Sequence, residues 1–194
     1  FSTSMFGSHQ KLVDTLDAFE RAARFAQNEA VLRNRIIRLA IKLDGESQSF
    51  TVQYGPDSDF VLPVQYFTSN DVSELLNDEE RSAKLEKVEK AFQNVEEFQE
   101  DPIEVDNLVT VIGIASGLTQ SMQFSNTASL FFYPSGEKDS AFIAIGTDEE
   151  MATLSYQAFT QEFDRKFFQI EGTTGDILEF QVAQAKKFYE EWLQ

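Results

Sequence analysis

The apolar period of the chain changes abruptly near Arg35, and this change restricts the fold more than any other feature. Beyond it, alternate positions from Ile37 to Leu43 are apolar, which is typical of a half-buried strand. Before it, apolar residues recur at steps of three and four, as on one face of a helix: Leu12, Leu16, Phe19, Ala23, Ala26 and Ala30. The sequence therefore predicts an N-terminal helix over 9–35 that runs directly into a strand.

A β-hairpin is predicted to follow this helix, in the region 36–70. Asp44-Gly45 is a strong turn signal, and the alternation resumes from Phe50 to Tyr54. Residues 1–8 show no apolar period, and we expect them to form a disordered N-terminal stretch.

The segment 71–101 differs in composition, because acidic residues greatly outnumber basic ones. Its apolar residues again have helical spacing and predict an inserted helix over 78–99: Leu85, Val88, Phe92 and Val95. That apolar side must be buried against something. The domain's own sheet is one alternative, and a partner protein is the other.

The rest of the chain predicts short strands followed by a helix. Strand patterns recur within 105–170 at intervals that favour antiparallel sheets over βαβ units. A helix is expected over 176–193, with Thr173 and Asp176 as a capping box. The prediction is a single α+β domain over 9–194.

Composition argues against most kinds of chemical site. The chain has no cysteine, and its one histidine, His9, follows the stretch predicted to be disordered. Ser116 stands one position late for a nucleophile elbow, and carboxylate clusters such as 148–150 lack a shaped calcium loop. We predict no catalytic residue, no metal ligand and no cofactor. The net charge of −17 also disfavours nucleic acid as a partner.

Two stretches together resemble a known family. The helix end contains Glu29-Ala30 and Arg33-Asn34-Arg35 and leads into the apolar hairpin. Further on, residues 131–136 read Phe-Phe-Tyr-Pro-Ser-Gly. In this order, over about 9–55 and 129–145, the chain resembles the minor pseudopilins of type II secretion. The likeness is to the H class (GspH-like) in particular, and to the FimT-like minor pilins of type IV systems.

The resemblance implies a pilin-like fold, in which a long N-terminal helix packs on antiparallel β-sheets. The inserted acidic helix and the C-terminal helix are additions to that pattern. The resemblance also implies a leader peptide that a prepilin peptidase removes, and an apolar first half of the helix before Phe1. That half would anchor a periplasmic domain in the inner membrane.

The resemblance further implies a structural role rather than an enzymatic one. The chain would be a minor subunit of a pseudopilus that drives protein export across the outer membrane. Other pseudopilins are the expected partners, with secreted cargo as a further candidate. Partner binding is assigned to the two apolar stripes: Leu12, Leu16, Phe19 and Ala23, and Leu85, Val88, Phe92 and Val95.

The alternative is a type IV minor pilin of the DNA-uptake or adhesion type, which shares the helix–hairpin start. A DNA receptor should present a basic stripe. The C-terminal segment 171–194 instead holds more acidic than basic residues.

Overall fold

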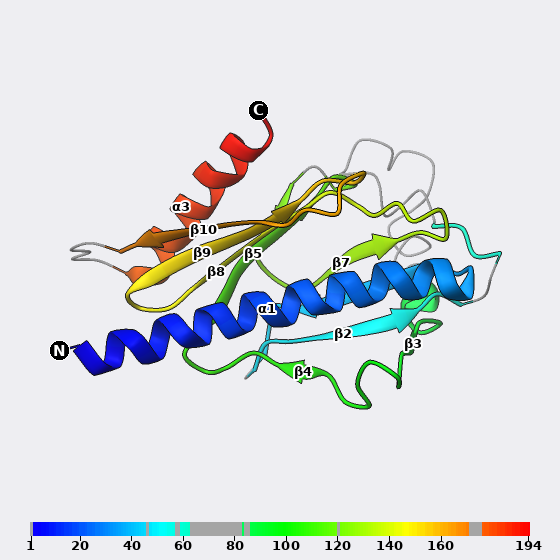
Figure 1. Cartoon of the computed structure of the whole chain (residues 1–194), viewed down its shortest axis with the longest axis horizontal. Coiled ribbons are helices and arrows are strands. Elements are labelled where there is room, and N and C mark those ends of the chain that lie inside the picture. Colours follow the sequence, from blue (N-terminus) through cyan, green and yellow to red (C-terminus); the bar gives the residue numbers. More distant parts are fainter. Residues whose placement is uncertain are drawn as a thin grey trace.

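Helix α1 (Ser2–Arg33) lies across two antiparallel β-sheets (Figure 1). The computed structural model describes residues 2–45, 47–56, 59–62, 83, 86–119, 121–170 and 176–194. The predicted α+β fold, a long N-terminal helix on antiparallel sheets with a C-terminal helix, is confirmed. The 32 residues of α1 make it about 48 Å long.

The predicted apolar stripe of α1 is the side that faces the sheets. Leu12, Leu16 and Phe19 are fully buried, and the small side chains of Ala23 and Ala26 then let the sheets approach closely. The ring of Phe19 packs at a tilt against that of Phe50 in the first sheet, with the ring centroids 4.6 Å apart. The stripe therefore forms the centre of the main core.

The helix begins at Ser2, so the prediction that residues 1–8 are disordered is wrong for 2–8. Adding turns to an existing helix is far easier than nucleating one, so a weak pattern suffices to extend it. The Ser8 hydroxyl also donates to Glu149 at 2.9 Å, and His9 Nδ1 lies 2.7 Å from Glu150 Oε2. These contacts hold this end of α1 against the second sheet.

The end of α1 explains the Arg-Asn-Arg step in physical terms. Asn34 has a φ of 52°, the left-handed conformation that closes a helix. The amide N–H of Arg35 donates to Ala30 O, and that of Asn34 donates to Val31 O. This is a Schellman motif, and it turns the chain directly into the first strand.

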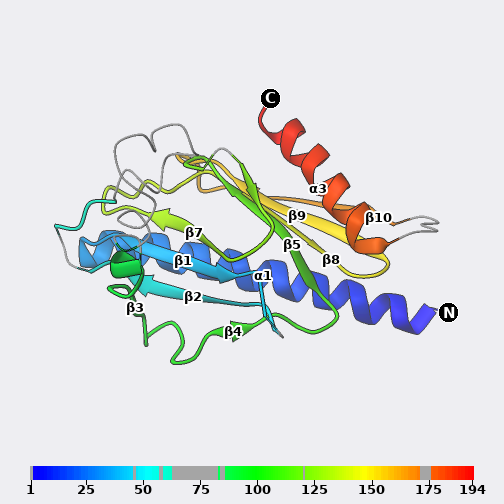
Figure 2. The same ribbon diagram turned by 180° about the vertical axis from the view of Figure 1, so that it is seen from behind.

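The first sheet is built on the predicted hairpin. Strand β1 (Ile37–Lys42) pairs with β2 (Ser49–Tyr54) on one side and with β7 (Thr127–Phe132) on the other. Two short strands, β3 (Gln93–Asn94) and β4 (Ile103–Glu104), pair with the outer edge of β2. In Figure 2, β1 passes in front of α1 and β2 runs beside β1.

The second sheet has the strand order β10-β9-β8-β5-β6, and every pairing is antiparallel. Its strands are β5 (Thr110–Ser116), β6 (Met122–Gln123), β8 (Ala141–Gly146), β9 (Glu150–Tyr156) and β10 (Asp164–Gln169). One face of this sheet joins the core beneath α1.

The predicted helix over 78–99 extends too far. Residues 86–89 are helical, but 93–94 form β3, and the Val95 N–H donates to Val52 O at 2.9 Å. The edge of β2 has backbone groups that need hydrogen-bond partners. A strand at 93–94 can pair with them, whereas a continued helix could not. Leu85 and residues 63–82 lie outside the described part of the chain.

Helix α3 (Ile177–Trp192) covers the other face of the second sheet. Ala185 and Tyr189 are buried there among Phe142 and Met151. The N-cap of α3 is Asp176, whose carboxylate accepts from Leu178 N and Glu179 N, so the predicted capping box with Thr173 is wrong in its register. Thr173 itself lies outside the described residues.

Replacing Asp176 by alanine should lower the free energy of unfolding by about 1 kcal/mol, because two amide groups lose their acceptor. Urea denaturation measures this change. Asp176→Asn is the matched control, since asparagine caps helices about as well as aspartate. Equal losses for both variants would contradict a capping role.

Among the described residues, neither helix combines the length and the hydropathy needed to cross a membrane.

Candidate assembly surface

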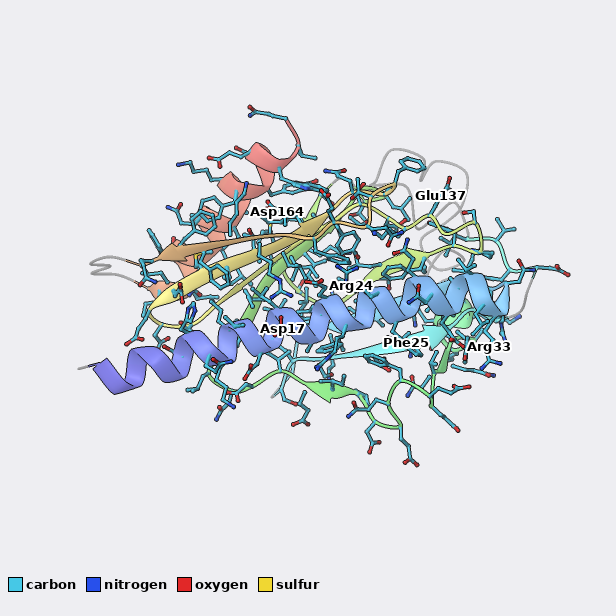
Figure 3. The ribbon with its side chains drawn as sticks, in the orientation of Figure 1. Asp17, Arg24, Phe25, Arg33, Glu137 and Asp164 are labelled. Carbon is cyan, nitrogen blue, oxygen red and sulfur yellow. The ribbon has the colours of Figure 1, made fainter. Side chains whose placement is uncertain are left out.

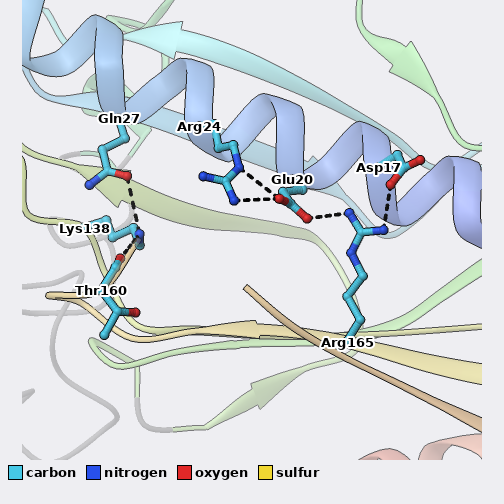
Figure 4. A network of polar contacts seen from close by, with 7 residues as sticks. All are labelled: Asp17, Glu20, Arg24, Gln27, Lys138, Thr160 and Arg165. Carbon is cyan, nitrogen blue, oxygen red and sulfur yellow. Dashed lines mark hydrogen bonds and ion pairs between the residues drawn. The ribbon is translucent and has the colours of Figure 1, made fainter. Parts of the chain in front are cut away.

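One flank of α1 is fastened to the second sheet by ion pairs, as Figure 4 shows. Arg165 of β10 donates to Asp17 at 2.6 Å and also to Glu20. Arg24 donates to the same Glu20 at 2.8 Å from the other side. Burial acts to raise the pKa of Glu20, but the two guanidinium groups hold it below its ordinary value. These pairs tie α1 to the second sheet, although the side chains of Asp17 and Arg24 stay about half exposed.

A buried lysine continues this flank toward the C-terminal end of α1. Lys138 is only 2% exposed, and its ammonium donates to Thr160 O at 2.5 Å and to Gln27 Oε1 at 3.4 Å. The rings of Tyr156 and Phe163 lie about 5 Å away. Burial, followed by the charge of Arg24, lowers the pKa of Lys138. The lysine joins α1 to the turn between β9 and β10.

The resemblance motif at 131–136 is a turn that is tied to α1. Gly136 has a φ of 86°, which favours glycine, and its carbonyl accepts from Gln27 Nε2 at 2.7 Å. The neighbouring Asp139 is 5% exposed and accepts from Phe131 N–H and the Tyr133 hydroxyl, both at 2.9 Å. Burial nevertheless raises the pKa of Asp139 to about 6.

The motif residues at the end of α1 make a second polar cluster. Glu29 accepts from Arg33 Nε at 2.7 Å and from the Tyr54 hydroxyl at 2.8 Å. Burial and then the bond to Glu29 raise the pKa of Tyr54 to about 12. Arg35 donates to the carbonyl of Gly55. Arg35 thus ties the helix end to the hairpin, and Arg33 holds the Glu29 carboxylate that accepts from Tyr54.

The side of α1 that neither sheet covers is a polar ridge, which we call the α1 ridge. It consists of Gln10, Asp14, Asp17, Arg21, Arg24, Asn28 and Leu32, all exposed. The labelled side chains of Asp17 and Arg24 lie along it in Figure 3. The N-terminal end of α1 also extends past the sheets in Figures 1 and 2. The ridge is a continuous part of α1 that a partner can reach.

The residues predicted to bind partners lie mostly in the interior. Leu12, Leu16, Phe19 and Ala23 are buried under the chain's own sheets. Binding of a partner by this stripe stays a prediction, and it would require the sheets to move away.

The second predicted stripe also packs within the chain. Phe92 and Val95 are buried, and Val88 packs partly against Phe92 and its neighbours. Leu85 lies outside the described residues.

The chemical groups considered from the sequence have structural partners. His9 faces Glu150, and the Ser116 hydroxyl accepts from Thr119 N–H at 3.2 Å, where β5 ends in a turn. Within the described ranges, no group of three or more histidine or acidic side chains could hold a metal ion.

Comparison with solved structures finds a minor pseudopilin. It is EpsH from the Type 2 Secretion System of Vibrio cholerae, with a TM-score of 0.42 and 12% sequence identity. The match covers 84% of this chain and 99% of that chain. No protein-family description and no curated protein matches the sequence.

Sequence reasoning missed the contacts that fasten α1. Arg165 lies 148 positions from Asp17, and Lys138 lies 111 positions from Gln27. Neither Arg165 nor Lys138 stands in a local sequence pattern that indicates which residue it will contact. The apolar residues around Lys138, from Phe131 to Tyr156, were the one available signal that its surroundings would be dry.

Proposed function

We propose that this chain is a minor subunit of a type II secretion pseudopilus and assembles with other pseudopilins through α1. The observation that supports this most is the arrangement of α1. One side is buried under two sheets, while the α1 ridge stays open along its length and the N-terminal end extends past the sheets. A helix covered on one side only can pack its other side against a neighbour.

The proposal includes an anchor and a compartment. An apolar helix half preceding Phe1 would hold the subunit in the inner membrane, with the described domain in the periplasm. The helix–hairpin and Pro-Ser-Gly motifs support the proposed anchor and compartment, because they are the basis of the resemblance to the H class. The insertion 71–101 and helix α3 would then be additions carried by this subunit.

Deletion of the gene should abolish or strongly reduce secretion of type II substrates, and the intact gene should restore it. The measurement is the fraction of a secreted enzyme found outside the cell. A periplasmic marker that must stay inside controls for leakage. Pull-down of the periplasmic domain with each pseudopilin of the same system identifies the partner. Normal secretion together with no pseudopilin bound would contradict the proposal.

DNA uptake is not supported by the charges that the structure describes. Five of the basic side chains on and beside α1 are paired with carboxylates, which leaves fewer for phosphate groups: Lys11, Arg24, Arg33, Arg38 and Arg165. We expect no shift of DNA in a gel at low salt, and a salt-sensitive complex would reverse this ranking.

A further inference from the structure

A groove with a volume of about 150 Å³ lies between α1 and the segment 103–106, which contains β4. On the α1 side it is lined by Lys11, Asp14 and Ala18, whose steps of three and four place them on one face of the helix. Phe50 of β2, a member of the main core, also lines it. The groove therefore borders on the core and opens to solvent.

The inner part of this groove is apolar. Phe50 and Val105 are buried, and Ala18 and Ile103 are half-buried beside them. Long charged side chains lay their methylene groups on such surfaces while the charged end stays near water. The floor of the groove thus favours an aliphatic stem.

The outer part of the groove is acidic. Asp14, Glu104 and Asp106 line it, against one basic side chain, Lys11. The Lys11 ammonium lies 2.8 Å from Asp106 Oδ2, and this hydrogen bond raises the pKa of Lys11 and lowers that of Asp106. The groove therefore already holds one cation of the chain itself. Asp14 and Glu104, both exposed, supply two further carboxylates.

The size of the groove selects a compact group. An engineered apolar cavity of similar volume in another protein binds benzene. A guanidinium group with the two methylene groups next to it has as many non-hydrogen atoms as benzene. A peptide segment is too large for this volume, so the groove can take the end of one side chain.

Arginine suits this lining better than lysine does. Its planar guanidinium binds carboxylates through paired N–H donors and is more weakly hydrated than an ammonium group. It can therefore leave bulk water above the apolar floor and still contact Asp14 or Glu104. An acidic or phosphorylated side chain would instead be repelled by the carboxylates.

We propose that this groove binds an arginine side chain of a partner protein. The stem lies on Ala18 and Ile103, and the guanidinium donates to Asp14 and Glu104. The inference rests on the proposed function only in taking the partner to be another subunit. The choice of arginine rests on the groove alone.

Titration with N-acetyl-L-arginine amide tests the chemistry without a partner. This probe carries the side chain but no charged terminus. In NMR spectra of the isotope-labelled chain, we expect saturable shifts at the amides of 11–18 and 103–106, with a dissociation constant in the millimolar range. The matched control is N-acetyl-L-citrulline amide, which has nearly the same shape and no charge. Equal shifts with both probes, or shifts spread over other acidic surfaces, would overturn the proposal.

Substitutions in the lining should change this affinity in opposite directions. Glu104→Gln should weaken binding of the arginine probe several-fold. Lys11→Met keeps most of the stem and removes the charge, so it should strengthen binding several-fold by making Asp106 available. Glu100→Gln, an exposed position outside the groove lining, is the control for net charge. Equal weakening by Glu100→Gln and Glu104→Gln would overturn the proposal, because it would show only the field of an acidic protein. Thermal melting of each variant confirms that it is folded.

Pull-down of each pseudopilin by the parent and by Glu104→Gln connects the groove to a partner. We expect the variant to capture several-fold less of one pseudopilin, with Glu100→Gln capturing as much as the parent. Full capture by Glu104→Gln would overturn the docking role of the groove and leave the subunit role intact. Failure of the parent to capture any pseudopilin would count against the subunit role, while the arginine titration would still decide the chemistry of the groove.

Discussion

Replacing Phe92 by alanine is expected to lower the free energy of unfolding by about 3–5 kcal/mol. The ring is 7% exposed and packs against Phe60 and Phe131, with centroids at 5.6 and 6.3 Å. The guanidinium carbon of Arg38 lies 3.8 Å from its centroid. Alanine would leave a cavity and remove the aromatic surface from a buried cation.

Urea denaturation of the isolated domain measures this loss. Phe159→Ala is the matched control, because Phe159 is 84% exposed and should change stability by less than about 0.5 kcal/mol. An unchanged melting temperature with lost partner binding would instead make Phe92 part of a docking surface.

The same contacts show how the later part of the insertion is fixed. Arg38, buried in β1, donates to Gln53 at 2.9 Å and to Glu89 at 2.6 Å. Removing one partner of such a pair leaves a buried group unsatisfied, which is costly. Residues 86–95 therefore belong to the fold of the first sheet.

The local patterns of the sequence were sufficient where neighbours along the chain decide the structure. The change of period at Arg35 fixes both α1 and the β1–β2 hairpin, since Ile41 pairs with Phe50 across the predicted turn. The spacing of Phe92 and Val95 fits a helix equally well. Only the open edge of β2, formed by residues some forty positions earlier, favours β3 there.

The polar contacts of α1 could not be predicted for a related reason. Asp17, Glu20 and Arg24 have the spacing of an ordinary solvated helix face. Whether Arg165 reaches them depends on how the second sheet packs under α1, which no local pattern encodes. The α1 ridge is defined only after these partners are known.

Asp139 should make the domain less stable at neutral pH than at acidic pH. Its pKa in the folded chain is about 6 against an ordinary value of 3.8, mainly because burial disfavours the charge. A carboxyl with a raised pKa contributes stability below the unfolded pKa and loses it as pH rises through the folded pKa. By the conversion of pKa to free energy, the full loss is about 3 kcal/mol, of which about 2.4 kcal/mol falls between pH 4 and pH 8.

Asp139→Asn should remove this loss. The amide oxygen can still accept from Phe131 N–H, and its N–H can donate to the Tyr133 oxygen. Burial raises the pKa of Tyr133 and Tyr156, so both hydroxyls stay protonated over this range. The basic residue nearest to Asp139 along the sequence is its neighbour Lys138. The variant should therefore be more stable than the parent by about 1–3 kcal/mol at pH 8 and equal to it near pH 4.

Urea denaturation of both proteins at several pH values measures this difference, in which the titration of all other groups cancels. Asp164→Asn, at an exposed position in β10, is the matched control for the loss of one carboxylate from the surface. A constant difference between Asp139→Asn and the parent at every pH would contradict the prediction, because it would mean that the carboxyl has the same pKa in the folded and unfolded chain. If the variant instead became less stable than the parent as pH rises, Asp139 would be a charged acceptor that stabilises the turn at Gly136, rather than a group whose ionisation opposes folding.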